Sequence, residues 1–215
     1  MFILVTTISG DTKAASGNFS SEIQSGNFLL VTYETANYDK WKVAFDDGET
    51  ERNKRGIVTR FLFGALDEVD KFLVFFETKD NKSAEDFLKT TQYYDFMKLT
   101  GSGSTDKIQS LEVVKLYKDE SVDSSGDFAF LNHPVKSLDE WKAIYEAHEA
   151  LRHGFGMRTL AIFKDNSSPV NVFILMTIKD FQTVVEYGSL PGMSETMEVA
   201  GVAGNAGMHL LEMKK

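Results

Sequence analysis

The strongest constraint on the fold is an internal repeat at an offset of 100 residues. Residues 38–56 read YDKWKVAFDDGETERNKRG, and residues 138–156 read LDEWKAIYEAHEALRHGFG. The segments 25–115 and 125–215 align without a gap and share 18 identities in 91 pairs. Chance matching at this composition would give about a third as many. We therefore predict one module of about 90 residues that occurs twice, too few copies for a solenoid of at least about three repeats.

Each copy shows the same order of predicted elements. Apolar patterning, cap residues and turn residues indicate a strand, a helix, two strands joined by a turn, a second helix and a last strand. The strands are expected at 27–33, 57–63, 72–78 and 108–117, and at 127–133, 157–163, 172–178 and 208–213. This β-α-β-β-α-β order is that of a ferredoxin-like split βαβ module.

The helices carry start signals of their own. Asn37 and Ser137 are expected to cap the first helix of each copy, and Ser83 and Thr183 the second. Gly56 and Gly156 follow the first helix, where a left-handed residue is favourable. The second helix is predicted to be continuous in the first copy. Gly188, Pro191 and Gly192 should break it in the second copy, leaving 193–200 as a separate piece.

The central strands FLVFFET and VFILMTI are apolar on both faces, so both faces of each sheet must be covered. The helices of a copy cover only one face. The other copy can cover the second face in the same chain, as a built-in pseudo-twofold dimer. We therefore predict an α+β fold of tandem ferredoxin-like βαββαβ repeats, packed sheet to sheet as an intrachain pseudo-dimeric α/β barrel. The expected divisions are an N-terminal strand and loose segment 1–26, repeat 1 at 27–117, a linker at 118–126 and repeat 2 at 127–215.

Charge and composition exclude several function classes. The net charge is −9 and no Lys/Arg cluster is present, which argues against nucleic-acid binding. No apolar run approaches the roughly 20 residues of a membrane helix, and the absence of cysteine excludes thiolate chemistry and disulfides. The opening MFILVTTIS lacks a basic n-region, so an edge strand is favoured over a signal peptide. We expect a cytoplasmic monomer with an internal pseudo-twofold, and the sequence leaves export and further oligomerisation open. We predict no nucleic-acid or membrane partner, no cofactor and no metal.

The residues carry a resemblance to a known superfamily. The pattern Trp41, Phe45, Arg52, Gly56 and Thr59-x-Phe, then a hairpin, a helix ending MEVAGVAG and a strand ending LLE, resembles the dimeric α/β-barrel superfamily over about residues 25–215. That group includes antibiotic-biosynthesis-type monooxygenases and stress-responsive A/B-barrel proteins. The resemblance implies a pocket between sheet and helices in each half, and it leaves the chemistry open because the fold hosts several functions.

All four histidines lie in the second copy. They are His133, His148, His153 and His209, and the first copy has Tyr33, Gly48, Asn53 and Gln109 in their places. One hypothesis is that the second copy holds a site in which histidine acts as an acid/base or binds a metal or haem iron. The alternative is a chance distribution. His148 and His153 are five residues apart on a helix and make a poor chelate. His148 instead lies on the buried stripe, on the same face as Arg152.

These considerations give a set of candidate residues and three rival functions. His148 and His133 are the candidate catalytic bases. The candidate ligand-binding residues are Tyr33, Trp41, Trp141, Tyr145, Arg152 and His209. The first hypothesis is a protein that binds a small apolar or aromatic molecule between sheet and helices. The alternatives are a cofactor-independent monooxygenase or isomerase that uses a histidine base in repeat 2, and a structural or interaction protein without a ligand.

The sequence positions of three arginines allow more than one interpretation. Glu49/Arg52 and Glu149/Arg152 recur three residues apart, which is typical of a surface ion pair as much as of a site. Arg60 lies inside an apolar strand and is predicted to meet Glu212 of the other copy, or to extend to solvent at a sheet edge.

Overall fold

The computed structural model describes residues 23, 26–98, 107–117, 126–167, 170–204 and 206–214. The predicted strand at the N-terminus lies outside these residues, as does all of the predicted linker but Gly126. No helix within the described ranges has the length and apolar character needed to cross a membrane.

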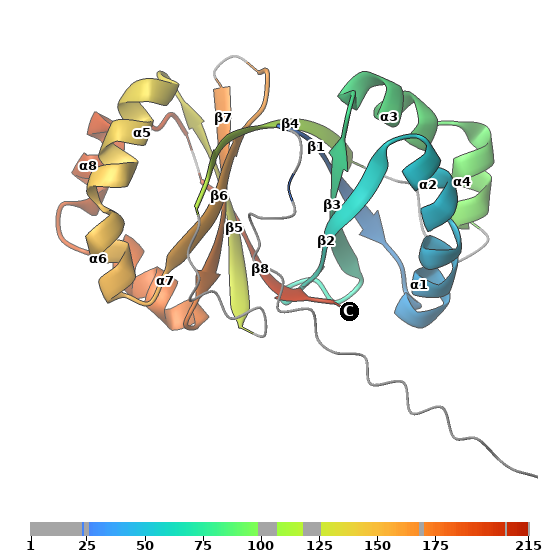
Figure 1. Ribbon diagram of the computed structural model, residues 1–215. Helices are drawn as coiled ribbons and strands as arrows, with labels where there is room; N and C mark the ends of the chain where they lie inside the picture. Colours follow the sequence, from blue (N-terminus) through green and yellow to red (C-terminus); the bar gives the residue numbers. More distant parts are fainter. Residues whose placement is uncertain are drawn as a thin grey trace, which may run out of the picture.

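The described strands form one closed antiparallel barrel (Figure 1). Repeat 1 contributes β1 (Asn27–Glu34), β2 (Ile57–Ala65), β3 (Lys71–Thr78) and β4 (Lys107–Leu116). Repeat 2 contributes β5 (Asp127–Val135), β6 (Arg158–Lys164), β7 (Val170–Ile178) and β8 (Gly207–Met213). Around the barrel the order is β1-β3-β2-β8-β5-β7-β6-β4. The predicted order of strands and the predicted fold class are both confirmed.

Two seams between the repeats close the barrel. Residues 63–65 of β2 pair with residues 211–213 of β8, and residues 112–116 of β4 pair with residues 161–164 of β6. The two seams are equivalent at the offset of 100, since Phe63 faces Met213 in one and Phe163 faces Val113 in the other. Each repeat therefore satisfies the edge strands of the other, and unpaired backbone groups are not left at an open sheet edge.

The helices cover the outside of the barrel in two separate layers, one over each repeat (Figure 1). Repeat 1 carries α1 (Tyr38–Asp47), α2 (Glu49–Lys54), α3 (Asn81–Leu88) and α4 (Thr91–Lys98). Repeat 2 carries α5 (Leu138–Ala147), α6 (Glu149–Gly154), α7 (Phe181–Gly188) and α8 (Met193–Val199). The break between α7 and α8 is the one predicted from Gly188, Pro191 and Gly192.

The caps of the first helices are as predicted. The Asn37 side chain accepts the N–H of Lys40, and the Ser137 side chain accepts that of Glu140. Gly56 and Gly156 adopt φ values of 71° and 72°, the left-handed conformation expected after the helix. Each helix nevertheless ends earlier than expected, because Gly48 and His148 separate α1 from α2 and α5 from α6.

Two predictions about the second helices are wrong. The caps are Asp80 and Asp180, whose carboxylates accept the N–H groups of Ser83 and Thr183 three residues later. A carboxylate is the stronger acceptor at a helix N-terminus and is also favoured by the helix dipole. The second helix of repeat 1 is also divided into α3 and α4. The Thr90 hydroxyl oxygen accepts the Tyr93 N–H, so Thr90 caps the start of a separate helix α4.

The apolar side chains form three cores. The barrel interior is filled from both repeats, and its rings include Phe63, Phe75, Phe130 and Phe163. A second core lies between the sheet and helices of repeat 1, and a third in the equivalent place in repeat 2. The difference between the second and third cores positions the candidate site.

Candidate functional site

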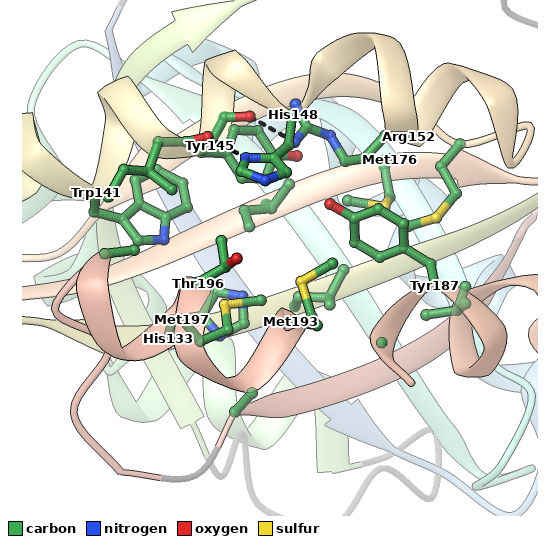
Figure 2. Close-up of a pocket in the computed structure, with 18 residues that line it drawn as sticks. His133, Trp141, Tyr145, His148, Arg152, Met176, Tyr187, Met193, Thr196 and Met197 are labelled. Carbon is green, nitrogen blue, oxygen red and sulfur yellow. Dashed lines mark hydrogen bonds between the residues drawn. The ribbon is translucent and has the colours of Figure 1, made fainter. Parts of the chain in front are cut away.

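A cavity of about 220 Å³ lies between the sheet and the helices of repeat 2. Trp141, Tyr145, His148 and Arg152 line it from α5 and α6 and the turn between them, while Met193, Thr196 and Met197 line it from α8. Figure 2 shows these two walls facing each other, with His133 of β5 and Met176 of β7 behind them. The walls are mostly apolar, and a few polar groups interrupt them.

The cavity exists because repeat 2 carries smaller side chains than repeat 1 at equivalent positions. Gly188 replaces Leu88, Met193 replaces Tyr93, and Thr196 replaces Phe96. In repeat 1 the Tyr93 hydroxyl hydrogen-bonds to that of Tyr33 at 2.9 Å, inside an aromatic core. Packed interiors contain few voids larger than a water molecule, so the open space in repeat 2 marks the place where a ligand can enter.

Two stacked rings form the apolar wall on α5. The Trp141 and Tyr145 ring centroids are 4.8 Å apart with an interplanar angle of 20°. The Tyr145 hydroxyl is 2.7 Å from Thr159 Oγ1, and burial raises its pKa far above the ordinary value of a tyrosine. Tyr145 therefore stays neutral and its ring is fixed, which gives the cavity a rigid flat surface suited to an aromatic ligand.

Arg152 brings a buried positive charge to this wall. Its side chain is 2% exposed, its Nη1 donates to the Tyr145 carbonyl oxygen at 2.6 Å, and its guanidinium carbon lies 3.6 Å from the Tyr145 ring centroid. Its Nη2 has no hydrogen-bond partner. The surface ion pairs predicted from the Glu/Arg spacing are absent among the described residues, because Arg152 and Arg52 are both buried. Glu149 lies instead near His153, at 3.8 Å.

The two candidate bases occupy different environments in the same cavity. His133 is 4% exposed, its Nδ1 has no hydrogen-bond partner, and burial lowers its pKa to about 4. His148 lies at the junction of α5 and α6, where its Nδ1 is 2.8 Å from the Ile144 carbonyl oxygen. When neutral, His148 donates through Nδ1 and keeps Nε2 as the ring acceptor. His133 is therefore the neutral imidazole of the cavity, and its Nδ1 has no hydrogen-bond partner.

The His133 environment predicts a pH-dependent stability. Its pKa is lower in the folded protein than the ordinary 6.5, so the unfolded chain binds more protons between pH 6.5 and about 4. Folding stability should fall across that window as the pH is lowered, by about 3 kcal/mol at most. Urea unfolding at about pH 7 and about pH 4.5 should show a smaller loss in His133→Phe than in the wild type. His153→Gln, which changes a partly exposed histidine, should behave like the wild type, and equal losses in all three proteins would contradict the assignment.

The other candidate residues lie outside this cavity. Tyr33 and Trp41 are fully buried in the filled core of repeat 1. His209 is half-buried on β8, and its ligand atom lies within 4.8 Å of those of Asp67 and Glu68 at the turn between β2 and β3. Lys71 forms an ion pair with the Glu68 carboxylate there, so this carboxylate already has a positively charged partner. The structure thus brings together Trp141, Tyr145, Arg152, His133 and His148, and places Tyr33, Trp41 and His209 elsewhere.

Sequence reasoning did not single out most of the apolar lining. The side chains missed include Met157, Met176, Tyr187, Met193, Thr196 and Met197. For three of them a signal is present in the repeat itself. Repeat 1 has aromatic rings at positions 76, 93 and 96, where repeat 2 has Met176, Met193 and Thr196, and such paired differences in side-chain size indicate a cavity.

Comparison with known proteins shows the fold. The sequence matches no protein-family model and none of the curated proteins. Among solved structures, an anthrone oxidase-like protein has a TM-score of 0.57 at 11% identity, with 89% of this chain and 92% of that chain covered. A candidate chlorite dismutase has a TM-score of 0.54 at 12% identity, with 88% and 94% covered. A candidate monooxygenase from Fusobacterium nucleatum has a TM-score of 0.53 at 15% identity, with 90% and 94% covered. The chain therefore has the dimeric α/β-barrel fold with ferredoxin-like halves.

Proposed function

We propose that this protein binds a small, flat, oxygen-bearing aromatic molecule in the cavity of repeat 2. The observation that carries the proposal is the cavity of about 220 Å³, apolar on most of its surface, that holds two buried polar groups with unsatisfied hydrogen-bonding capacity. Ligand sites commonly have this composition, with apolar walls and a few polar groups that fix the orientation.

The volume limits the size of the ligand. An apolar cavity of about 150 Å³ in another protein accommodates benzene, and ligand pockets in general range from about 300 to 1,000 Å³. The cavity of about 220 Å³ in repeat 2 lies between these values and suits one or two fused rings. The stacked Trp141 and Tyr145 supply a flat face, and Met176, Met193 and Met197 supply walls that adjust to the shape of the ligand.

The two polar groups of the cavity, Arg152 and His133, indicate which substituents the aromatic ligand carries. Arg152 Nη2 is a buried donor without a partner, so it favours a carbonyl or phenolate oxygen on the ligand. His133 Nδ1 is also without a partner, and the neutral imidazole can accept the hydrogen of a hydroxyl group. A hydroxylated aromatic compound would satisfy both groups, whereas a plain hydrocarbon would leave them unsatisfied.

Calorimetry with 1-naphthol and naphthalene tests this proposal. We expect 1-naphthol to bind with one site per chain, and naphthalene to bind at least about ten-fold more weakly, since each unsatisfied buried polar group costs about 1–3 kcal/mol. Arg152→Met should reduce the preference for naphthol over naphthalene while keeping naphthalene binding. Lys142→Gln, a change of a half-buried charge on the neighbouring helix α5 and outside the cavity, should leave both affinities unchanged. Failure of both compounds to bind would overturn the proposal.

A second candidate function is a cofactor-independent oxygenase, favoured by the same His133. A neutral buried imidazole is in the correct state at physiological pH to take a proton from an acidic hydroxyl group. Arg152 would then stabilise the resulting oxyanion, and dioxygen would be the oxidant. An anthrone oxidase-like protein and a candidate monooxygenase share the fold. Oxygen consumption with a bound hydroxyaromatic compound, lost in His133→Phe while binding persists, would support this candidate, and an absence of consumption would leave binding as the function.

A further inference from the structure

Repeat 1 has a second pocket, of about 230 Å³ and of opposite chemical character. It lies against α1, α2 and β2, and it is lined by Lys42, Arg52, Arg60 and Lys214 together with polar and apolar neighbours. Lys214 follows β8 of repeat 2 and its backbone N–H donates to the Leu62 carbonyl oxygen at 2.9 Å. The pocket is therefore assembled from both repeats.

Arg52 is the cation of this pocket that lacks a counter-charge among the described residues. Lys42 pairs with Asp46 at 2.6 Å, Arg60 with Glu77 at 2.5 Å, and Lys214 with Glu212. The partner found for Arg60 is thus Glu77 of its own repeat and not Glu212, the partner that the sequence had suggested.

The guanidinium group of Arg52 is buried without enough hydrogen-bond partners, which is energetically unfavourable. Its side chain is 1% exposed, and its Nε and Nη1 have no hydrogen-bond partner. The Phe45 ring, 4.0 Å from the guanidinium carbon, offers only partial compensation. A buried cation without an anionic partner is unfavourable, so the free Nε and Nη1 donors of Arg52 favour an anionic acceptor in the pocket.

The equivalent place in repeat 2 shows how the pocket arose. There the Tyr145 hydroxyl hydrogen-bonds to Thr159 Oγ1 at 2.7 Å. Repeat 1 has Phe45 in place of Tyr145, so the Oγ1 of Thr59 is buried without a partner. Arg60 also replaces the buried Leu160, and Lys214 corresponds to Val114. Compared with the equivalent place in repeat 2, this pocket lacks one hydroxyl group and has Arg60 and Lys214 in place of Leu160 and Val114, while both places have the buried arginine.

We propose that this pocket binds a small oxyanion, held by Arg52 and the Thr59 hydroxyl group and closed by Lys214. Carboxylates and phosphates share the required chemistry, because both accept charge-assisted hydrogen bonds from a guanidinium group. Asp46 and Glu49 also line the pocket and repel additional negative charge, so a monoanionic carboxylate should bind more tightly than a phosphate dianion. This site is separate from the apolar cavity, and each repeat would therefore bind a different class of molecule.

The test is an NMR titration of the full chain with acetate and with inorganic phosphate, at an ionic strength held constant with chloride. We expect saturable shifts of the Gly48, Arg52 and Thr59 amide signals, with acetate binding more tightly than phosphate. Thr59→Val and Lys214→Gln should each weaken binding, and Arg52→Met should weaken it at least about ten-fold. Lys82→Gln, which removes the same charge from an exposed position, should bind as the wild type does.

The outcomes separate the alternatives. Tighter binding of phosphate would assign the site to phosphate compounds and overturn the preference for carboxylates. If Arg52→Met does not fold, Thr59→Val and Lys214→Gln decide the question, because neither removes a buried charge. An absence of saturable shifts, or unchanged affinity in both variants, would overturn the proposal.

Discussion

Replacing Phe75 by alanine is expected to lower the free energy of unfolding by about 3–5 kcal/mol, the range observed for large-to-small changes in a packed core. Phe75 is fully buried in the barrel interior. Its ring contacts Phe63 of its own repeat at a centroid distance of 5.8 Å, and Phe130 and Phe163 of the other repeat at 5.3 and 5.9 Å. The variant therefore removes packing between the two repeats as well as within one.

Urea unfolding followed by far-UV circular dichroism measures this loss. Phe181→Ala is the matched control, because it deletes the same ring from a position that is 48% exposed at the start of α7. The control should change stability by well under the core value, about 1 kcal/mol or less. If Phe75→Ala proved as mild as the control, the barrel interior could not be the shared core described above.

The second large effect is expected from Thr196→Phe, which restores in repeat 2 the ring that repeat 1 has at Phe96. Figure 2 shows Thr196 on α8, facing the opposite wall of the cavity. A phenyl ring there should fill the space that the ligand needs and weaken 1-naphthol binding by about 100-fold or more, equivalent to about 2.7 kcal/mol. The fold should be retained, because the equivalent ring packs well in repeat 1.

Thr196→Val separates volume from chemistry. It removes a hydroxyl group that bonds only to the Gly192 carbonyl oxygen at 3.0 Å among the described residues, and it keeps the size of the side chain. Its naphthol affinity should stay within about three-fold of the wild type, a change of well under 1 kcal/mol. Calorimetry on the wild type and both variants, with melting temperatures as the check on folding, gives the answer. Undiminished binding by Thr196→Phe would place the ligand outside the cavity.

Much of the fold could be predicted from local patterns. The repeat fixed the number of modules, and apolar runs bounded by turn residues located every strand in the described ranges to within a few residues. The caps at Asn37 and Ser137 were also predictable, because a cap depends only on residues three positions apart. The caps at Asp80 and Asp180 were missed although they obey the same rule, since a serine or threonine nearby offered a competing choice.

The candidate site was predicted only in part. His133, His148, Trp141, Tyr145 and Arg152 were identified, since they combine reactive or aromatic groups with a buried stripe. The burial of Arg152 was left open, because the spacing of Glu149 and Arg152 suits a surface pair and only tertiary packing shows that the arginine is buried.

The sequence by itself determined that a βαββαβ module is duplicated and that each sheet needs cover on both faces, because these properties follow from periodicity along the chain. The tertiary structure decided which edges join, which arginines lie in the interior, and that repeat 2 holds an apolar cavity at the place where repeat 1 has an aromatic core. The reason is that cavities and unsatisfied groups depend on the summed volumes and directions of side chains from four or more distant segments, and no local pattern contains that sum.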